Sequence, residues 1–239
     1  MSIFLPVYLF IYLFIYTFAY KLTLKNLINM VKTNSQLRQE SRALLSGHWG
    51  AAVVATLVSL VIGGFFYGLM LGDMEGGSTF TLIFWVAYFL ILSPLMLGYI
   101  NAFYIFIKGE QPIEVANMFK IFSSKYYWKT VGVYFLNWLY TALWSLLLVI
   151  PGVIKGLSYY LAPYILLENP EIGAEGAIKQ SMKMMKGHKG RLFLMLLGMM
   201  GLTFVSMLLL GIPMLWLTPY YQTVFVKFYL DIKENYVEA

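Results

Sequence analysis

Long apolar blocks separated by short polar segments are the feature that most constrains how this chain can fold. A membrane-spanning helix needs about 20 predominantly apolar residues, and its backbone must satisfy its own hydrogen bonds inside the lipid. Hydrophobic residues make up 60% and charged residues 12% of the 239 residues, and the mean hydropathy is +0.73. The sequence therefore predicts an all-α membrane protein. Its apolar blocks are residues 2–20, 49–71, 80–107, 131–150, 153–167, 192–210 and 214–229.

The positions of lysine and arginine predict the orientation of these blocks. If the polar segment near Thr33 is cytoplasmic and each later block crosses the membrane once, Lys155 alone lies on the outer side. Because short cytoplasmic segments carry the excess of basic residues, we expect a six-transmembrane-helix core with a cytoplasmic C-terminus. The residues assigned to the cytoplasmic side are Lys21, Lys25, Lys32, Arg38, Arg42, Lys108, Lys120, Lys125, Lys129, Lys179, Lys183, Lys186, Lys189, Arg191, Lys227 and Lys233.

Proline and glycine mark the places where the blocks should bend or turn. Proline ends or kinks a helix because it lacks an amide hydrogen, and glycine allows a tight turn. The block 153–167 would be only about 22 Å long as a helix, so it either crosses a thinned membrane or forms a re-entrant arm. The expected hinge positions are Pro94, Pro151, Gly152, Gly211 and Pro213.

Residues 1–29 form a separate N-terminal hydrophobic segment. Tyrosine and phenylalanine alternate with isoleucine, leucine, threonine and alanine from Tyr8 to Tyr20, and the charge and small residues of a signal peptide are missing. The segment is an extra span with an outside N-terminus, a membrane anchor, or the translation of A/T-rich upstream DNA with the true start at Met30. We favour the last interpretation. Residues 30–239 are expected to form a single integral membrane domain.

The most basic segment, residues 174–191, has the pattern of an amphipathic helix. Apolar residues recur at helical spacing on one face, lysines occupy the opposite face, and Gly187 marks the end. We expect such a helix on the membrane surface, and a similar one over residues 33–46, where Thr33 and Gln36 have capping-box spacing. The predicted membrane-surface basic residues are Lys179, Lys183, Lys186, Lys189, Arg191, Arg38 and Arg42.

A recurring motif indicates an internal repeat. Residues 41–50 and 181–190 both have the pattern Ser-x-x-apolar-apolar-x-Gly-His-x-Gly, and the region before residue 131 resembles a degenerate third copy. In each second arm a helix-perturbing residue precedes a tyrosine: Gly98-Tyr99, Pro163-Tyr164 and Pro219-Tyr220. We interpret the pattern as three units, each an interfacial helix followed by a helical hairpin, over residues 34–107, 113–168 and 173–230. The alternative is chance similarity among apolar segments.

No residue pattern points to catalysis, a metal or a cofactor. Cysteine is absent, and the two histidines, His48 and His188, have no neighbouring ligands at metal-binding spacing. Each histidine follows a glycine at an expected helix end, where a half-polar ring suits the headgroup region. The basic residues lie at the ends of apolar blocks and not in an aromatic-rich patch, so no nucleic acid partner is expected. We therefore expect a protein that is not an enzyme.

Neutral polar residues remain at membrane depth, where ionisable residues are nearly absent. A charged transport path is thus not indicated. The neutral groups either hold helices together by hydrogen bonds or line a polar path, and we favour helix packing. The candidates are Tyr99, Asn101, Asn137, Tyr164, Tyr220 and Gln222.

Three stretches resemble a known family. Residues 150–170, which begin Ile-Pro-Gly-Val-Ile-Lys-Gly, and residues 177–193, which contain Met-Lys-Gly-His-Lys, are similar to a bacterial family of multi-pass integral membrane proteins, domain of unknown function 975. Residues 37–49 resemble the start of that family. The resemblance implies a location in the cytoplasmic (inner) membrane of a bacterium. It implies no activity and no catalytic residues.

Two functions from different classes fit these observations. The first is a non-enzymatic membrane module that interacts with a lipid bilayer carrying anionic headgroups, or with a membrane protein partner. The alternative is a transporter or channel for a neutral or amphipathic solute, with the broken second arms lining the path. An intramembrane enzyme fits less well because no acid, base or nucleophile is suitably placed. The oligomeric state stays open.

Overall fold

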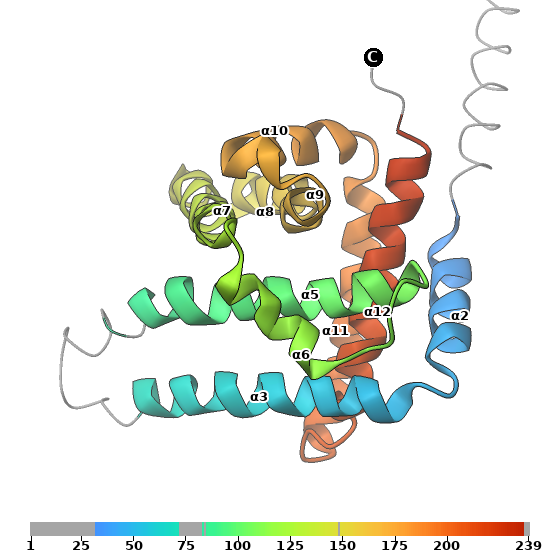
Figure 1. Ribbon diagram of the computed structural model, residues 1–239. Coiled ribbons are helices and arrows are strands. Elements are labelled where there is room, and N and C mark those ends of the chain that lie inside the picture. Colours follow the sequence, from blue (N-terminus) through green and yellow to red (C-terminus); the bar gives the residue numbers. More distant parts are fainter. Residues whose placement is uncertain (1–31, 72–82, 84, 148, 237–239) are drawn as a thin grey trace, which may run out of the picture.

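The computed structural model describes residues 32–71, 83, 85–147 and 149–236, and this part of the chain consists of helices and their connections (Figure 1). It confirms the predicted all-α class. The segment 1–29 and the acidic turn after residue 71 lie outside the described residues. The elements are α2 (Asn34–Leu45), α3 (Trp49–Leu71), the π-helical segment η1 (Tyr88–Leu92), α5 (Ser93–Ile107), α6 (Val115–Phe119), η2 (Lys120–Ser123), α7 (Tyr127–Leu147), α8 (Val149–Tyr159), α9 (Ala162–Glu168), η3 (Pro170–Ile172), α10 (Gly173–Met184), α11 (Lys189–Leu208) and α12 (Met214–Glu234).

Four helical segments in the described residues are long and apolar enough to cross a membrane. They are Trp49–Gly68, Trp85–Ile107, Ile150–Glu168 and Lys189–Leu208. The helices α7 and α12 contain 21 residues each, but they carry many tyrosine, tryptophan and amide side chains, and α12 ends in charged residues. The four segments support a membrane protein. They are candidate spans, whereas the sequence predicted six spans.

The long helices follow one another as outgoing and returning pairs. Helix α3 pairs with α5, α7 with α8 and α9, and α11 with α12. We call the first helix of each pair (α3, α7, α11) the outgoing helix and the second (α5, α8–α9, α12) the returning helix. In Figure 1 the α3–α5 pair lies across the view, α11 and α12 run down it, and α7, α8 and α9 are seen nearly end on. The three pairs therefore point in different directions and do not form a parallel bundle.

The pairs pack on one another in a cycle. Each returning helix receives the short helix and the outgoing helix of the next pair: α6 and α7 pack on α5, α10 on α9, α11 on α8, and α2 and α3 on α12. The returning helices also meet at the centre, because α5 contacts both α9 and α12. The rings of Tyr164 and Tyr229, 5.5 Å apart and stacked, join α9 to α12. We call the end of the molecule that carries α2, α6 and α10 the basic end.

The helix ends at the two histidine motifs have the same local geometry. Gly47 and Gly187 both adopt positive φ, +83° and +88°, a backbone conformation that suits a residue without Cβ. The amide of His48 donates to the carbonyl of Leu45 at 2.9 Å, and the amide of His188 donates to that of Met185 at 3.1 Å. Leu45 and Met185 are both fully buried, so both motifs place an apolar residue in the core just before the turn.

The start of α2 follows the predicted capping box. The amide of Gln36 donates to the Thr33 hydroxyl at 3.2 Å, and the amide of Thr33 donates to the Gln36 side chain at 2.7 Å. Two amides that lack intrahelical partners are satisfied in this way. The capping box therefore sets where α2 begins.

Pro94 lies directly after a local change in helix geometry. The π-helical segment η1 precedes it, and Pro94 occupies the first turn of α5. Proline cannot donate to the carbonyl of Leu90, four residues earlier, and the Tyr127 hydroxyl of α7 donates to that carbonyl at 2.6 Å instead. The freed backbone group thus becomes a contact between two helices.

The break after α7 differs from the prediction. Helix α7 ends at Leu147 and α8 begins at Val149, so Pro151 and Gly152 lie in the first turn of α8 and do not end the preceding helix. Proline is tolerated there because amides of a first turn have no intrahelical acceptor. Gly152 is required by space, since a Cβ would lie 2.9 Å from the Cα of Ser145 on α7.

The second arm of this pair is itself broken, and α10 stabilises the break. Helix α8 ends at Tyr159 and α9 starts at Ala162. The buried Ser181 of α10 donates to the carbonyl of Ser158 at 2.7 Å and accepts from the amide of Leu161 at 3.1 Å. The motif serine therefore satisfies backbone groups that the break would leave unpaired.

The turn between the last two helices lies where it was expected. Gly211 has a φ of +74° and Leu210 a φ of +59°, and Pro213 immediately precedes α12. The positive φ at Leu210 is costly for a residue with a Cβ. Gly211 adopts its own positive φ without this cost, because glycine has no Cβ.

A substitution at Gly98 would test whether α6 packs closely on α5. A Cβ at Gly98 would overlap the backbone carbonyl of Met118 and lie 3.0 Å from its Cα, whereas a Cβ at Gly201 of α11 would meet nothing within 4 Å. We expect Gly98→Ala to lower the apparent melting temperature, by the equivalent of roughly 1–3 kcal/mol, in tryptophan-monitored thermal unfolding in detergent. Gly201→Ala is the matched control and should leave it unchanged or higher. Equal melting temperatures for both variants would contradict the close contact.

Candidate functional site

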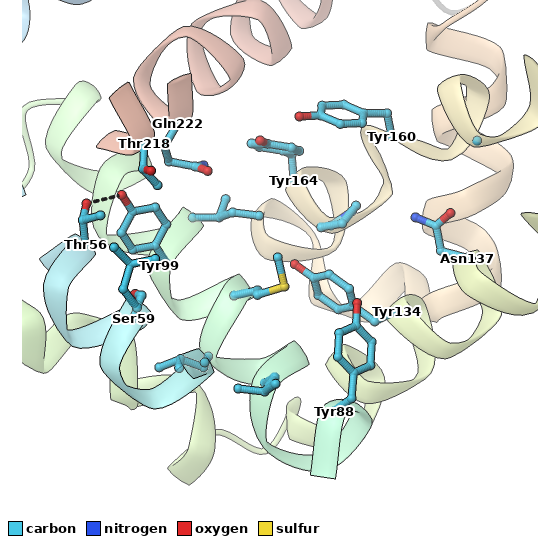
Figure 2. A pocket seen from close by; sticks show the side chains of 18 residues that line it. Thr56, Ser59, Tyr88, Tyr99, Tyr134, Asn137, Tyr160, Tyr164, Thr218 and Gln222 are labelled. Atoms are coloured by element: carbon cyan, nitrogen blue, oxygen red, sulfur yellow. Dashed lines mark hydrogen bonds between the residues drawn. The ribbon is translucent and has the colours of Figure 1, made fainter. Parts of the chain in front are cut away.

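A cavity of approximately 520 Å³ lies among the long helices. This volume is within the range of about 300–1,000 Å³ that is typical of small-molecule sites. Its walls come from α3, η1, α5, α7, α8, α9 and α12 (Figure 2). All three helix pairs therefore contribute to the walls, the third pair through α12 alone among the described residues. The lining residues are Thr56, Ser59, Leu60, Gly63, Tyr88, Leu92, Leu95, Met96, Tyr99, Ile100, Tyr134, Asn137, Gly156, Tyr160, Pro163, Tyr164, Thr218 and Gln222.

Polar groups gather on two sides of this cavity. On one side, the hydroxyls of Thr56 and Tyr99 form a hydrogen bond of 2.8 Å, with Thr218 and Gln222 beside them (Figure 2). The Thr56 hydroxyl also donates to the carbonyl of Ala52 at 2.9 Å, so the Tyr99 hydroxyl is the donor in the first bond. The hydrogen bond from Thr56 to the preceding turn of α3 fixes the Thr56 hydroxyl, and this hydroxyl in turn orients Tyr99 of α5 within the cavity.

The amide of Gln222 points into the cavity and faces the Tyr164 hydroxyl (Figure 2). Its Nε2 atom is buried, yet it makes no hydrogen bond of normal geometry within the described residues. A buried donor without a well-placed acceptor is costly. Gln222 therefore retains a donor that a ligand oxygen could satisfy.

The opposite side of the cavity carries Tyr88, Tyr134, Tyr160 and Asn137 (Figure 2). A second hollow of approximately 390 Å³ shares Tyr88, Tyr134 and Asn137 with the first. The polar wall therefore continues along α7 toward Thr141 and Ser145. Tyr160 is also packed on Phe225 of α12, with ring centroids 5.2 Å apart.

The cavity is electrically neutral and has an apolar rim. Among the described residues, its lining contains no aspartate, glutamate, lysine or arginine. Leu60 of α3 and Met96 of α5, both lining residues, are 47% and 50% exposed. The opening between α3 and α5 therefore presents apolar side chains at a surface made largely of apolar residues.

A carboxylate at the basic end joins the three returning helices beyond the cavity. Glu168, the last residue of α9, accepts hydrogen bonds from Tyr104 of α5 at 2.7 Å and Tyr229 of α12 at 2.6 Å. Lys233 of α12 forms an ion pair with it, and the ammonium of Lys108 lies 3.8 Å away. The sequence analysis did not select Glu168, because its partners are distant along the chain.

Two further ion pairs hold α12 at this end. The guanidinium of Arg191 lies 2.7 Å from the carboxylate of Asp231, which is 4% exposed. Arg191 also donates to the side chain of Asn34 at 3.2 Å and to the carbonyl of Lys32. Arg191 was predicted to face the membrane surface, but its guanidinium is directed toward these partners.

Glu40 of α2 forms the second pair. Lys227 of α12 lies 2.5 Å from its carboxylate and Lys32 lies 3.0 Å away. The hydrogen bond from Lys227 holds the pKa of Glu40 below its usual value. Lys227 thereby anchors α2 against α12, the helix on which it packs.

The other predicted surface lysines and arginines have distinct surroundings. Lys179 and Lys183 are exposed on α10, and Lys186 is exposed in the turn that follows it. The opposite face of α10 packs on α7, α8 and α9. Lys189 is half-buried at the start of α11. The guanidinium of Arg42 lies over the Tyr220 ring at 5.5 Å. That of Arg38 lies against α11, where a Cβ added to Gly198 would be 2.7 Å from it.

The predicted polar candidates divide into two groups. Tyr99, Asn137, Tyr164 and Gln222 line the cavity, whereas Asn101 and Tyr220 do not. The hydroxyl of Tyr220 is buried and has no hydrogen-bond partner among the described residues. The sequence analysis missed the lining residues Thr56, Ser59, Tyr88, Tyr134, Tyr160 and Thr218. The spacing of Thr56 and Ser59 on one face of an apolar helix was the available signal.

The histidines lie outside the cavity. The ring of His48 packs on that of Phe106, with centroids 4.9 Å apart, and burial lowers the pKa of His188. The described residues contain no cluster of three or more histidine, cysteine, aspartate or glutamate side chains that could hold a metal ion. Both rings lie at the turns that lead into α3 and α11.

Together these features define a helical membrane protein with an uncharged internal cavity and a charged basic end. Residues 30–155 and 146–236 match the family model described as Protein of unknown function (DUF975). The chain belongs to this family, as the resemblance had indicated. No curated protein and no solved structure matches the chain.

The Arg191–Asp231 pair gives a direct test of the basic end. Arg191→Met should strongly lower the melting temperature, because removing one partner of a buried ion pair costs roughly 3–5 kcal/mol. Adding Asp231→Asn to that variant should restore much of the loss. Lys179→Met, which removes an exposed pair with Glu175 at 2.7 Å, is the control and should change little. A small effect of Arg191→Met would show that the pair does not hold α12 in place.

Proposed function

We propose that this protein is a non-enzymatic helical module of the bacterial cytoplasmic membrane that binds anionic lipid headgroups through its basic end. One observation carries the proposal: α10 buries one face against α7, α8 and α9, while Lys179 and Lys183 on its other face and Lys186 in the turn that follows are exposed. Within the described residues Lys183 and Lys186 make no ion pair. Each such lysine near an anionic surface contributes about 1 kcal/mol.

The proposal includes six spans arranged as three units. The cyclic packing, in which each short helix lies on the preceding returning helix, supports this architecture, as do the matching turns at Gly47 and Gly187. On this basis α7 and α12 cross the membrane with the four more apolar segments. Because the pairs diverge (Figure 1), a shared membrane normal would run between their directions, and every pair would be tilted.

The same architecture supports a cytoplasmic C-terminus. Glu168, Asp231 and Glu40 pair with basic residues at one end, and the exposed lysines of α10 lie at that end as well. Lys155, the one basic residue assigned to the outer side, instead lies over the Trp144 ring at 4.5 Å. The net positive charge of this end favours the cytoplasmic leaflet.

Nanodiscs of different lipid charge test the proposal. We expect the wild-type protein to melt at a higher temperature in phosphatidylglycerol than in phosphatidylcholine discs. The combined variant Lys179→Gln, Lys183→Gln and Lys186→Gln should reduce this difference in melting temperature by the equivalent of roughly 3 kcal/mol of stabilisation. The matched control is Lys155→Gln, which should retain the difference. If the triple variant behaves like the wild type in both lipids, the exposed face of α10 does not bind anionic lipid.

Transport of a neutral solute is the second candidate function, and the cavity is the observation that favours it. The cavity is lined by groups of all three returning helices, among them Tyr99, Tyr164 and Gln222, and broken helices often line transport paths. A glycerol-uptake assay by light scattering in proteoliposomes should then show faster uptake than empty liposomes. Gly156→Leu, inside the cavity, should slow uptake while Gly201→Leu should not. Uptake equal to that of empty liposomes would count against transport of small polyols.

A further inference from the structure

We propose that the central cavity is a binding site for an uncharged single-chain amphiphile, which enters from the lipid phase between α3 and α5. The occupant has an apolar chain and a neutral head that carries hydroxyl or carbonyl oxygens. The proposal is independent of the binding of anionic headgroups by α10, because it concerns other residues and the interior of the molecule.

The absence of charge in the lining sets the class of ligand. Burying an ionised group without a partner is very costly, and the part of the cavity wall that the structure describes offers no acidic or basic side chain to pair with it. The ion pairs of Glu168, Asp231 and Glu40 are all at the basic end. A ligand that carries a phosphate or carboxylate therefore has no counterion within the site.

The polar groups of the cavity match a neutral head. The Tyr99 hydroxyl donates to Thr56 and keeps lone pairs that can accept a hydrogen bond from a ligand hydroxyl. The buried Nε2 of Gln222 lacks a well-placed acceptor within the described residues and can donate to a ligand oxygen. These groups lie together on the α3–α12 side of the cavity (Figure 2).

The apolar part of the cavity leads to the surface. Leu92 and Leu95 continue the wall from Tyr99, and the exposed side chains of Leu60 and Met96 form the rim. A ligand chain that lies along this wall would leave the site among lipid-facing residues. Entry from water would instead require polar residues at the opening, so the rim favours a ligand already dissolved in the membrane.

Two adjacent glycines of α3 provide matched variants. Gly63 lines the cavity, Gly64 does not, and a Cβ at either position would meet nothing within 4 Å. Gly63→Phe therefore adds bulk at the cavity, while Gly64→Phe adds the same bulk to an exposed position of the same helix. Unchanged thermal unfolding of both variants would show that they remain folded.

Photocrosslinking in nanodiscs tests the proposal with defined probes. A monoacylglycerol with a diazirine in its chain is the neutral probe, and a diazirine fatty acid is its anionic counterpart. We expect the neutral probe to label the α5 peptide around Met96 and unlabelled monoacylglycerol to compete. Labelling should fall roughly tenfold in Gly63→Phe, remain unchanged in Gly64→Phe, and fall about fivefold in Gln222→Leu, which removes one hydrogen bond to the head.

Three results would overturn the proposal. The first is labelling spread evenly over the lipid-facing helices without competition, and the second is equal labelling of Gly63→Phe and Gly64→Phe. The third is equal labelling by the anionic probe, which would show that the site does not select uncharged heads. None of these results bears on the lipid dependence of the α10 lysine variants, so the two proposals can fail separately.

Discussion

The meeting of three returning helices at Glu168 is the interaction on which the rest of the structure depends. One carboxylate accepts hydrogen bonds from Tyr104 on α5 and Tyr229 on α12 and pairs with Lys233. Hydrogen bonds to an ionised acceptor are stronger than neutral ones, and they join helices that are distant in sequence. Because the helices are held together at this end and diverge from it, the space between them widens into the cavity lined by Tyr99, Tyr164 and Gln222.

Short helices secure the same end from outside. The packing of α6 on α5 is so close that only a glycine fits at position 98, and Ser181 of α10 satisfies the backbone at the break between α8 and α9. The ion pair of Glu40 and Lys227 fixes α2 on α12. Each joint uses a different chemistry, yet each fixes a short helix on the returning helix of the preceding pair.

Local features of this fold could be predicted from the sequence, whereas contacts between distant segments could not. The capping box at Thr33 and the glycine end of the basic helix depend on neighbouring residues, so periodicity and spacing identified them. The position of Pro151 in the first turn of α8 was missed because proline is compatible with both ends of a break. The partner of Arg191 was missed because Asp231 lies on another helix. Four cavity residues were found because polar groups are rare at membrane depth, but Thr56 and Tyr134 resembled ordinary members of apolar blocks.

The exposed lysines of α10 and the uncharged cavity lie in different parts of the molecule. The two proposed interactions should therefore depend on different conditions. In the proposed interaction with anionic lipid, the lysines of α10 act over distance through water, so their contribution would depend on headgroup charge and be screened as the Debye length falls from about 8 Å at physiological salt to about 3 Å at 1 M. The described lining of the cavity is uncharged, and the proposed binding there would depend on apolar area and on a few hydrogen bonds at close range. Salt should therefore weaken the first interaction while it leaves the second unchanged. An effect of headgroup charge on cavity occupancy would require the α10 lysines to shift the helices that line it. Helix α10 packs on α7, α8 and α9, which all contribute to the lining, and Ser181 binds the backbone at the α8–α9 break, next to Pro163 and Tyr164.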